Sequence, residues 1–208
     1  MKEIYFLFTD TGTYLSKGIH FWTKEKLNHV SIAFDKALTE VYSFGRKNPR
    51  NPFSGGFVKE DIRSEFFKQT TCAIYSYRVT EVEYKKIRTK INQFEAMKND
   101  YKYNFIGLFG ILLQIEWNRD HAMFCSQFIG TILRDIDSFQ FQKPACFLTP
   151  ADIWNHEGMQ FFYQGNLHEY IASLSVEKDD HYLKELSVPR KPSFVLAIPK
   201  KVKQFVIR

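Results

Sequence analysis

Short runs of apolar residues bounded by turn-forming residues predict a series of β-strands. Residues 4–8 form an unbroken β-branched and aromatic run, which is typical of a buried strand. Four further runs have strand character, at residues 29–34, 40–44, 71–79 and 193–198. Four of the five runs lie in the first 80 residues, so strand formation is concentrated near the start of the chain.

The segment HVSIAF (29–34) alternates as a half-buried strand does, with its larger apolar side chains on one face. His29 and Ser31 share the other face, whose small residues would let a helix approach closely. Residues 40–44 are expected to pair with this segment as a hairpin. In the register that we predict, Ser43 lies directly opposite His29, on the same face.

Three segments carry helix signals. Thr80 and Glu83 form a capping box ahead of apolar residues at helical spacing. A second apolar helical face follows Cys125, and Pro150 favours the first turn of a short third helix. Residues 105–115 are the most apolar segment but are much shorter than the roughly 20 residues that cross a bilayer. We expect a buried helix there, or alternatively the wall of a lipid-binding groove.

The order of these elements indicates one domain of the α+β class. The chain has 208 residues, of which 44% are hydrophobic and 25% charged, unlike a disordered, collagen-like or coiled-coil protein. Consecutive strands followed by helices favour a mostly antiparallel sheet packed against helices. We therefore predict a single domain over residues 1–208, with a C-terminal extension from about residue 171.

The basic charge balance raises nucleic acid and anionic surfaces as partners. The chain has 29 basic and 23 acidic side chains, a formal net charge of +6. Part of the excess lies in residues 45–56, a segment rich in Gly and Pro that we expect to be a loop, and part lies in the C-terminal lysines. No helix-turn-helix or RNP-type pattern accompanies these charges, so nucleic acid is the disfavoured partner.

The three cysteines, Cys72, Cys125 and Cys146, are odd in number and widely spaced, which argues against a disulfide framework and a zinc site. No pattern indicates a metal or another cofactor. Unpaired thiols are typical of a reducing compartment. The N-terminal apolar run is too short for a signal peptide. We expect a cytoplasmic protein without a transmembrane segment.

Cys125 is the candidate nucleophile. It precedes the apolar face of its predicted helix, and the positive end of a helix dipole favours a thiolate. Cys72, inside a predicted strand, and Cys146, beside Pro144, fit the ordinary interpretation of cysteine as a small buried hydrophobe better.

A thiol nucleophile needs a base, and His29 is the candidate. A third group should orient the imidazole from the neighbouring strand, and in the expected register this group is Ser43. A hydroxyl lacks the charge that stabilises an imidazolium, which makes Ser43 a weak orienting group. Glu60 and Asp61 are acidic alternatives later in the chain.

Four motifs in order, NHVSIAF, VYSFG, YKYNFIGL and FCSQFIG, resemble the circularly permuted branch of the NlpC/P60 papain-like superfamily. This branch includes the YiiX/YaeF-like bacterial proteins and the lecithin:retinol acyltransferase-like enzymes. The resemblance covers roughly residues 1–170. It implies a papain-like fold with Cys125 as nucleophile, His29 as general base and acid, and Ser43 at the third position. Family members usually carry His, Glu or another stronger polar group there, so Ser43 departs from the pattern.

The residues and the resemblance predict a cysteine hydrolase, amidase- or peptidase-like, or an acyltransferase. The substrate would be a small peptide, an acyl amide or an acyl lipid that forms a thioester at Cys125, with the backbone N–H of that residue in the oxyanion hole. The alternative is a papain-like domain with a weak or inactive site that binds a lipid, peptide or protein partner. Ser43 is the feature that favours this alternative.

Overall fold

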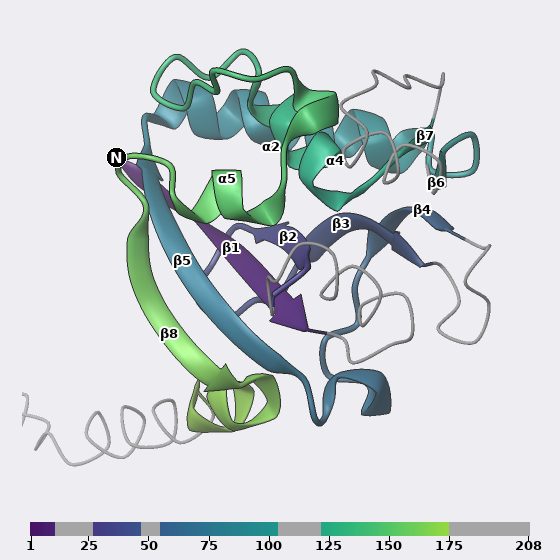
Figure 1. Ribbon diagram of the computed structural model, residues 1–208, viewed down its shortest axis with the longest axis vertical. Coiled ribbons are helices and arrows are strands. Elements are labelled where there is room, and N and C mark those ends of the chain that lie inside the picture. The colour runs from purple at the N-terminus through teal and green to yellow at the C-terminus, as the bar shows by residue number, and fades with distance from the viewer. Residues whose placement is uncertain (11–26, 47–54, 104–121, 175–208) are drawn as a thin grey trace, which may run out of the picture. The chain divides into compact units, whose positions relative to one another are not determined.

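Six antiparallel strands form one sheet in the order β4-β3-β2-β1-β5-β8 (Figure 1). The computed structural model describes residues 1–10, 27–46, 55–103 and 122–174 of the chain. The strands of this sheet are β1 (Lys2–Asp10), β2 (His29–Ala33), β3 (Val41–Arg46), β4 (Gly55–Lys59), β5 (Thr71–Val79) and β8 (Gln160–Asn166). The α+β class and the antiparallel sheet are thereby confirmed.

The remaining elements are short strands and helices. A second, parallel pair consists of β6 (Lys102–Tyr103) and β7 (Ala122–Met123). The α-helices with defined bounds are α2 (Glu81–Ala96), α4 (Cys125–Leu133) and α5 (Pro150–Trp154), and residues 167–174 are also helical. Two 3₁₀ turns are η1 (Glu65–Phe67) and η2 (Ala145–Phe147).

Strand β1 is central and is buried on both faces, which explains its unbroken apolar sequence. Ile4, Phe6 and Phe8 belong to the larger core, whereas Tyr5 and Leu7 belong to a smaller core on the opposite face. The larger core is also built by side chains of α2, α4 and α5, which cover the same face of the sheet (Figure 1). The sheet therefore separates two apolar cores.

All three predicted helix starts are confirmed. Thr80 caps α2, and its capping box with Glu83 is complete. Helix α4 begins at Cys125, and Thr149 caps α5 with Pro150 in the first turn. The predicted strand at residues 71–79 is confirmed with the same bounds as β5. These elements carry strong local signals, so no tertiary information is needed to place them.

The expected register of the β2–β3 hairpin is wrong by two residues. The structure pairs Ile32 with Tyr42 and Ala33 with Val41, so the connection comprises residues 34–40. Within it, Leu38 has a positive φ of 50° and a fully buried side chain. Because a two-residue slip preserves alternation, Ser43 stays on the face of His29, but Gly45 takes the position opposite His29.

The segment 45–56 is also more regular at its ends than predicted. Strand β3 continues through Arg46, and β4 begins at Gly55, with Gly45 paired to Gly56. Strands β4 and β8 were not predicted at all. The predictions for residues 105–115 and 193–198 fall outside the described residues, as does most of the C-terminal extension.

Among the described residues, no helix is both long enough and apolar enough to cross a membrane.

Candidate active site

Cys125 is the first residue of α4, preceded by the extended N-cap residue Phe124. The helix forms here because Phe128, Ile129 and Ile132 give it an apolar face that is fully buried in the larger core. The thiol is therefore held where the helix leaves N–H groups without intrahelical acceptors, and Cys125 is 4% exposed.

His29 is the first residue of β2, and its ring contacts both Cys125 and Glu60. The Nε2 atom lies 2.6 Å from Oε1 of Glu60, and the Cys125 side chain is close enough to the imidazole to raise its pKa. Because Nε2 faces the carboxylate, we assign Nδ1 as the nitrogen that serves the thiol. This order, thiol to imidazole to carboxylate, is the arrangement required of a nucleophile, a base and an orienting group.

The ion pair changes the ionisation of both partners. Burial by itself lowers the pKa of His29, but the Glu60 carboxylate, its hydrogen bond to the ring and the nearby Cys125 side chain raise it to about 10. Burial acts in the opposite direction on Glu60, whose pKa is nevertheless lowered by His29 and by hydrogen bonds from Ser43 and Ser31. We therefore assign an imidazolium and a carboxylate to this pair at neutral pH.

Glu60 is bonded through both of its carboxylate oxygens. Its Oε1 accepts from His29 and, at 2.5 Å, from the hydroxyl of Ser43, and its Oε2 accepts from the hydroxyl of Ser31 at 2.9 Å. The carboxylate is almost entirely buried, with a side-chain exposure of 7%. Three donors around a buried carboxylate fix its orientation and offset part of its desolvation.

The structure places Ser43 against Glu60 rather than against the imidazole. The contact that the sequence assigned to Ser43 is made by Glu60, which supplies the negative charge that a hydroxyl lacks. Ser43 and Ser31 both donate to this carboxylate from neighbouring strands. The other acidic alternative, Asp61, is exposed, and its carboxylate accepts from the backbone N–H of Arg63.

Knowledge of strand β4 would have been enough to choose Glu60 as the acidic partner of His29. Ser43 pairs with Val58, and the backbone N–H of Glu60 continues the ladder by donating to Val41 at 2.8 Å. Side chains two apart on a strand share a face, so Glu60 lies diagonally across from Ser43. Without the pairing of residues 55–59, the sequence leaves Glu60 and Asp61 equivalent.

The expected approach of the nucleophile helix is corrected. We expected α4 over the small-residue face of β2, but its apolar side chains pack in the larger core with Val30 and Ile32, on the other face. Gly45 lies beside the histidine, where a Cβ would make an ordinary contact with Cε1 of His29, at 3.5 Å, and a tight one with Oγ of Ser43, at 3.3 Å.

The other two cysteines lie elsewhere. Cys72 is buried in β5, where burial raises the pKa of its thiol to about 12, and Cys146 is partly exposed in η2. All three cysteines are outside disulfides. The described residues contain no cluster of three His, Cys, Asp or Glu side chains that could hold a metal ion.

A hollow of about 720 Å³ lies apart from these groups. Its lining includes Tyr77, Lys143, Asp152 and His156, and Lys143 forms an ion pair of 2.6 Å with Asp152. Neither the thiol nor the imidazole of the candidate site borders it. Size alone therefore does not mark the position of the reactive groups.

No protein-family model matches the chain, and neither a curated protein nor a solved structure matches it.

Proposed function

We propose that this chain is a cysteine hydrolase of the permuted NlpC/P60 papain-like type, with Cys125 as nucleophile. The observation that carries the proposal is the buried His29–Glu60 ion pair next to the Cys125 side chain, which itself raises the pKa of the imidazole. Its sequence support is the resemblance of the motifs around His29 and Cys125. Glu60 takes the role that Ser43 would fill only weakly.

In the proposed acylation step, the Cys125 thiolate attacks the carbonyl carbon of an amide or ester. The carbonyl π electrons move to oxygen, and N–H groups at the start of α4 stabilise this oxyanion. The His29 imidazolium, favoured by a pKa of about 10, then donates its proton to the leaving amine or alcohol as the bond to carbon breaks. A thioester and a neutral imidazole result.

In the proposed deacylation step, a water molecule attacks the thioester carbonyl. His29 accepts a proton from the water, and the C–S bond breaks to return the acid product, the thiolate and the imidazolium. Glu60 stabilises the cationic ring before acylation and again at the end of deacylation and, by holding Nε2, leaves Nδ1 for the thiol. Replacement of water by another nucleophile would make the same step an acyl transfer.

The substrate class that we propose is a small peptide or an acyl amide. An amidase- or peptidase-like reaction requires a thiol, an imidazole and an oxyanion donor, and the groups to which we assign these roles are Cys125, His29 and the N–H groups at the start of α4. An acyl-lipid substrate belongs to the same chemistry, because an ester carbonyl is attacked in the same way.

The alternative is a papain-like domain that binds a lipid, peptide or protein without turnover. The observation that favours it is the low exposure of Cys125, at 4%, because a nucleophile has to reach its substrate. The two functions differ in thiol reactivity, since a binding domain does not require a thiolate.

Alkylation by iodoacetamide across a pH series tests the proposal. Peptide mass mapping separates the three thiols, and the partly exposed Cys146 is the internal reference. We expect Cys125 to be modified at a pH well below that required by Cys146, because a neighbouring imidazolium stabilises the thiolate. The variant His29→Ala should lose this difference while Cys146 labels as before.

Equal and slow labelling of Cys125 and Cys146 in the wild type would reject the hydrolase. Low-pH labelling that persists in His29→Ala would reject the role of His29. A panel of acyl amides and aminoacyl esters, assayed with the wild type and with Cys125→Ala, then separates turnover from binding.

A further inference from the structure

Glu60 lies just outside the regular part of the sheet, so its position needs support from its neighbours. It follows Lys59, the last residue of β4, and its N–H makes one further ladder bond to Val41. Beyond it the chain turns, with the N–H of Ser64 donating to the carbonyl of Asp61. A side chain at such a boundary is aimed by the residues on both sides of it.

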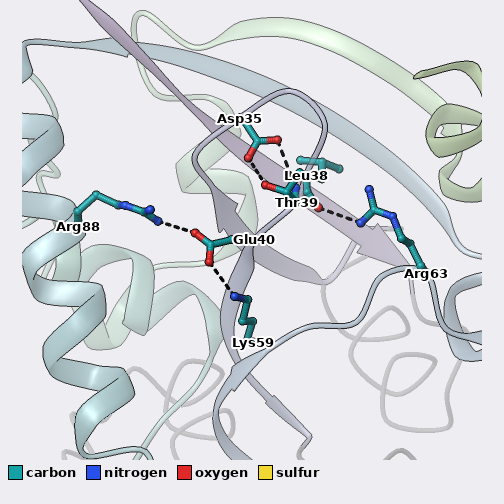
Figure 2. A network of polar contacts seen from close by, with 7 residues as sticks. All are labelled: Asp35, Leu38, Thr39, Glu40, Lys59, Arg63 and Arg88. Carbon is teal, nitrogen blue, oxygen red and sulfur yellow. Dashed lines mark hydrogen bonds and ion pairs between the residues drawn. The ribbon is translucent and has the colours of Figure 1, made fainter. Parts of the chain in front are cut away.

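On the N-terminal side of Glu60, Lys59 is hydrogen-bonded to Glu40, which is also hydrogen-bonded to Arg88 of α2. Glu40 accepts from Lys59 at 2.7 Å and from Arg88 at 2.9 Å, one bond to each carboxylate oxygen. Figure 2 shows Glu40 between these two cations. The hydrogen bonds from these two cations lower the pKa of Glu40 to about 2, and the one from Lys59 has the larger effect. The carboxylate is therefore charged at any pH at which the chain would be assayed.

On the C-terminal side of Glu60, Arg63 is hydrogen-bonded to the β2–β3 connection. Its guanidinium donates to the carbonyl oxygen of Leu38 at 3.3 Å (Figure 2) and to that of Ala37 at 3.1 Å. A planar guanidinium can hold two acceptors at once in a fixed geometry. Arg63 therefore links the chain that follows Glu60 to the turn that joins the two strands bearing Ser31 and Ser43.

That turn is itself well fixed. Leu38 adopts a left-handed backbone conformation with a φ of 50°, which is uncommon for a residue with a branched side chain, and it is fully buried. The Asp35 carboxylate accepts from the backbone and the hydroxyl of Thr39, at 3.2 and 2.5 Å (Figure 2). The turn is thus a defined anchor point for the guanidinium.

We propose that Lys59 and Arg63 are positioning residues that hold Glu60 against His29. Together with their acceptors on Glu40 and on the β2–β3 turn, these two residues form a brace around the Glu60 carboxylate. The inference rests on the proposed function, because it assigns a role in the ionisation of the Cys125–His29 pair. Exposed ion pairs contribute little to the free energy of unfolding, so we expect the brace to act on the position of the Glu60 carboxylate.

The test measures Cys125 alkylation against pH in Arg63→Ala, Lys59→Ala and the double variant. A displaced carboxylate stabilises the imidazolium less, so the thiolate should form at higher pH. We expect the midpoint of Cys125 alkylation to rise by roughly half to one pH unit in the single variants and further in the double variant. Arg63→Lys, which keeps the charge without the fork, should fall between wild type and Arg63→Ala.

Arg78→Ala is the matched control, because Arg78 is an exposed arginine on β5 with an ion pair to Glu3 at 3.4 Å. It should leave the alkylation midpoint unchanged. Far-UV circular dichroism and thermal melting establish that each variant is folded. If Arg63→Ala unfolds, Arg63→Lys and Lys59→Ala carry the same prediction.

The outcomes distinguish the two claims. If the brace variants alkylate as the wild type does while His29→Ala loses its low-pH reactivity, the brace is overturned and the hydrolase stands. If His29→Ala and the wild type label alike, the role of His29 in the proposed hydrolase fails, and the brace fails with it. A shift equal to that of Arg78→Ala would assign the effect to surface charge and would also overturn the brace.

Discussion

His29 and His156 each lie between polar groups, but the groups differ in kind. His29 lies between a carboxylate and a thiol, and its side chain is 15% exposed. His156 lies between two backbone carbonyls, with Nδ1 2.7 Å from that of Glu157 and Nε2 3.0 Å from that of Gln140. A full negative charge stabilises an imidazolium next to a thiol, whereas carbonyl groups mainly fix the orientation of a ring.

The two histidines also differ in the side chains that pack against their rings. The His156 ring stacks on Phe139 with centroids 3.8 Å apart and planes 11° apart, and it meets Phe141 and Tyr77 at their edges. His29 instead faces Ser31 and Gly45 beside its polar partners. Both rings have polar partners, so the presence of such contacts does not distinguish the histidine that we propose to be reactive. The charge and chemistry of its partners do.

Glu60→Gln should have the largest effect on the difference between His29 and His156. The amide keeps the shape of the side chain but removes the charge, so burial becomes dominant and lowers the pKa of His29. We expect Cys125 alkylation near pH 6 to slow by roughly 100-fold, equivalent to two pKa units. The same kinetics in His156→Gln should equal those of the wild type. Wild-type rates in Glu60→Gln would remove Glu60 from the site.

The elements that the sequence predicted and those that it missed differ in where their signals lie. Helix α2 has its capping box and α5 has Thr149 and Pro150, which are local and sufficient. Strand β8 is an edge strand with Phe161 and Phe162 exposed, so it lacks the alternation that burial imposes. Strand β4 begins with two glycines, which indicate a turn when read alone.

The same distinction holds for the site. Cys125 and His29 were selectable because each begins a predictable element, and the structure brings them together. Glu60 depends on the pairing of β4 with β3, and the place of Ser43 depends on a register set by a turn with a buried Leu38. Non-local pairing and an uncommon turn are set by tertiary packing, which the residue pattern does not encode locally.

The second prediction concerns stability against pH. The pKa of His29 rises from 6.5 in the unfolded chain to about 10 in the folded chain, so the folded state binds more protons between these values. The stabilisation is complete below pH 6.5 and is lost as the pH rises towards 10. Over this window the free energy of unfolding should fall by up to about 1.4 kcal/mol per pH unit because of His29.

Urea unfolding at several pH values measures this slope, in a Cys125→Ser background so that this thiol does not titrate. His29→Ala in the same background is the reference, since the difference between the two slopes cancels every other titrating group. Equal slopes would show that His29 is neutral in the folded chain and would contradict the ion pair with Glu60.

The smallest predicted effect is that of His156→Gln on stability. Glutamine can satisfy one of the two carbonyls but cannot reproduce the stacking on Phe139. Aromatic pairs contribute about 0.5–1.5 kcal/mol beyond their buried area, so we expect a loss of about 1 kcal/mol in the free energy of unfolding. Urea unfolding at neutral pH measures it.

His156→Phe sharpens the comparison, because it keeps the stacking surface and removes the two ring nitrogens that face the carbonyls. If packing dominates, His156→Phe should be more stable than His156→Gln, and both should alkylate at Cys125 as the wild type does. Slower alkylation in either variant would mean that the two regions are coupled through the larger core, which contains both Phe139 and Cys125. The division into a reactive and a packing histidine would then be wrong, since one core would control both.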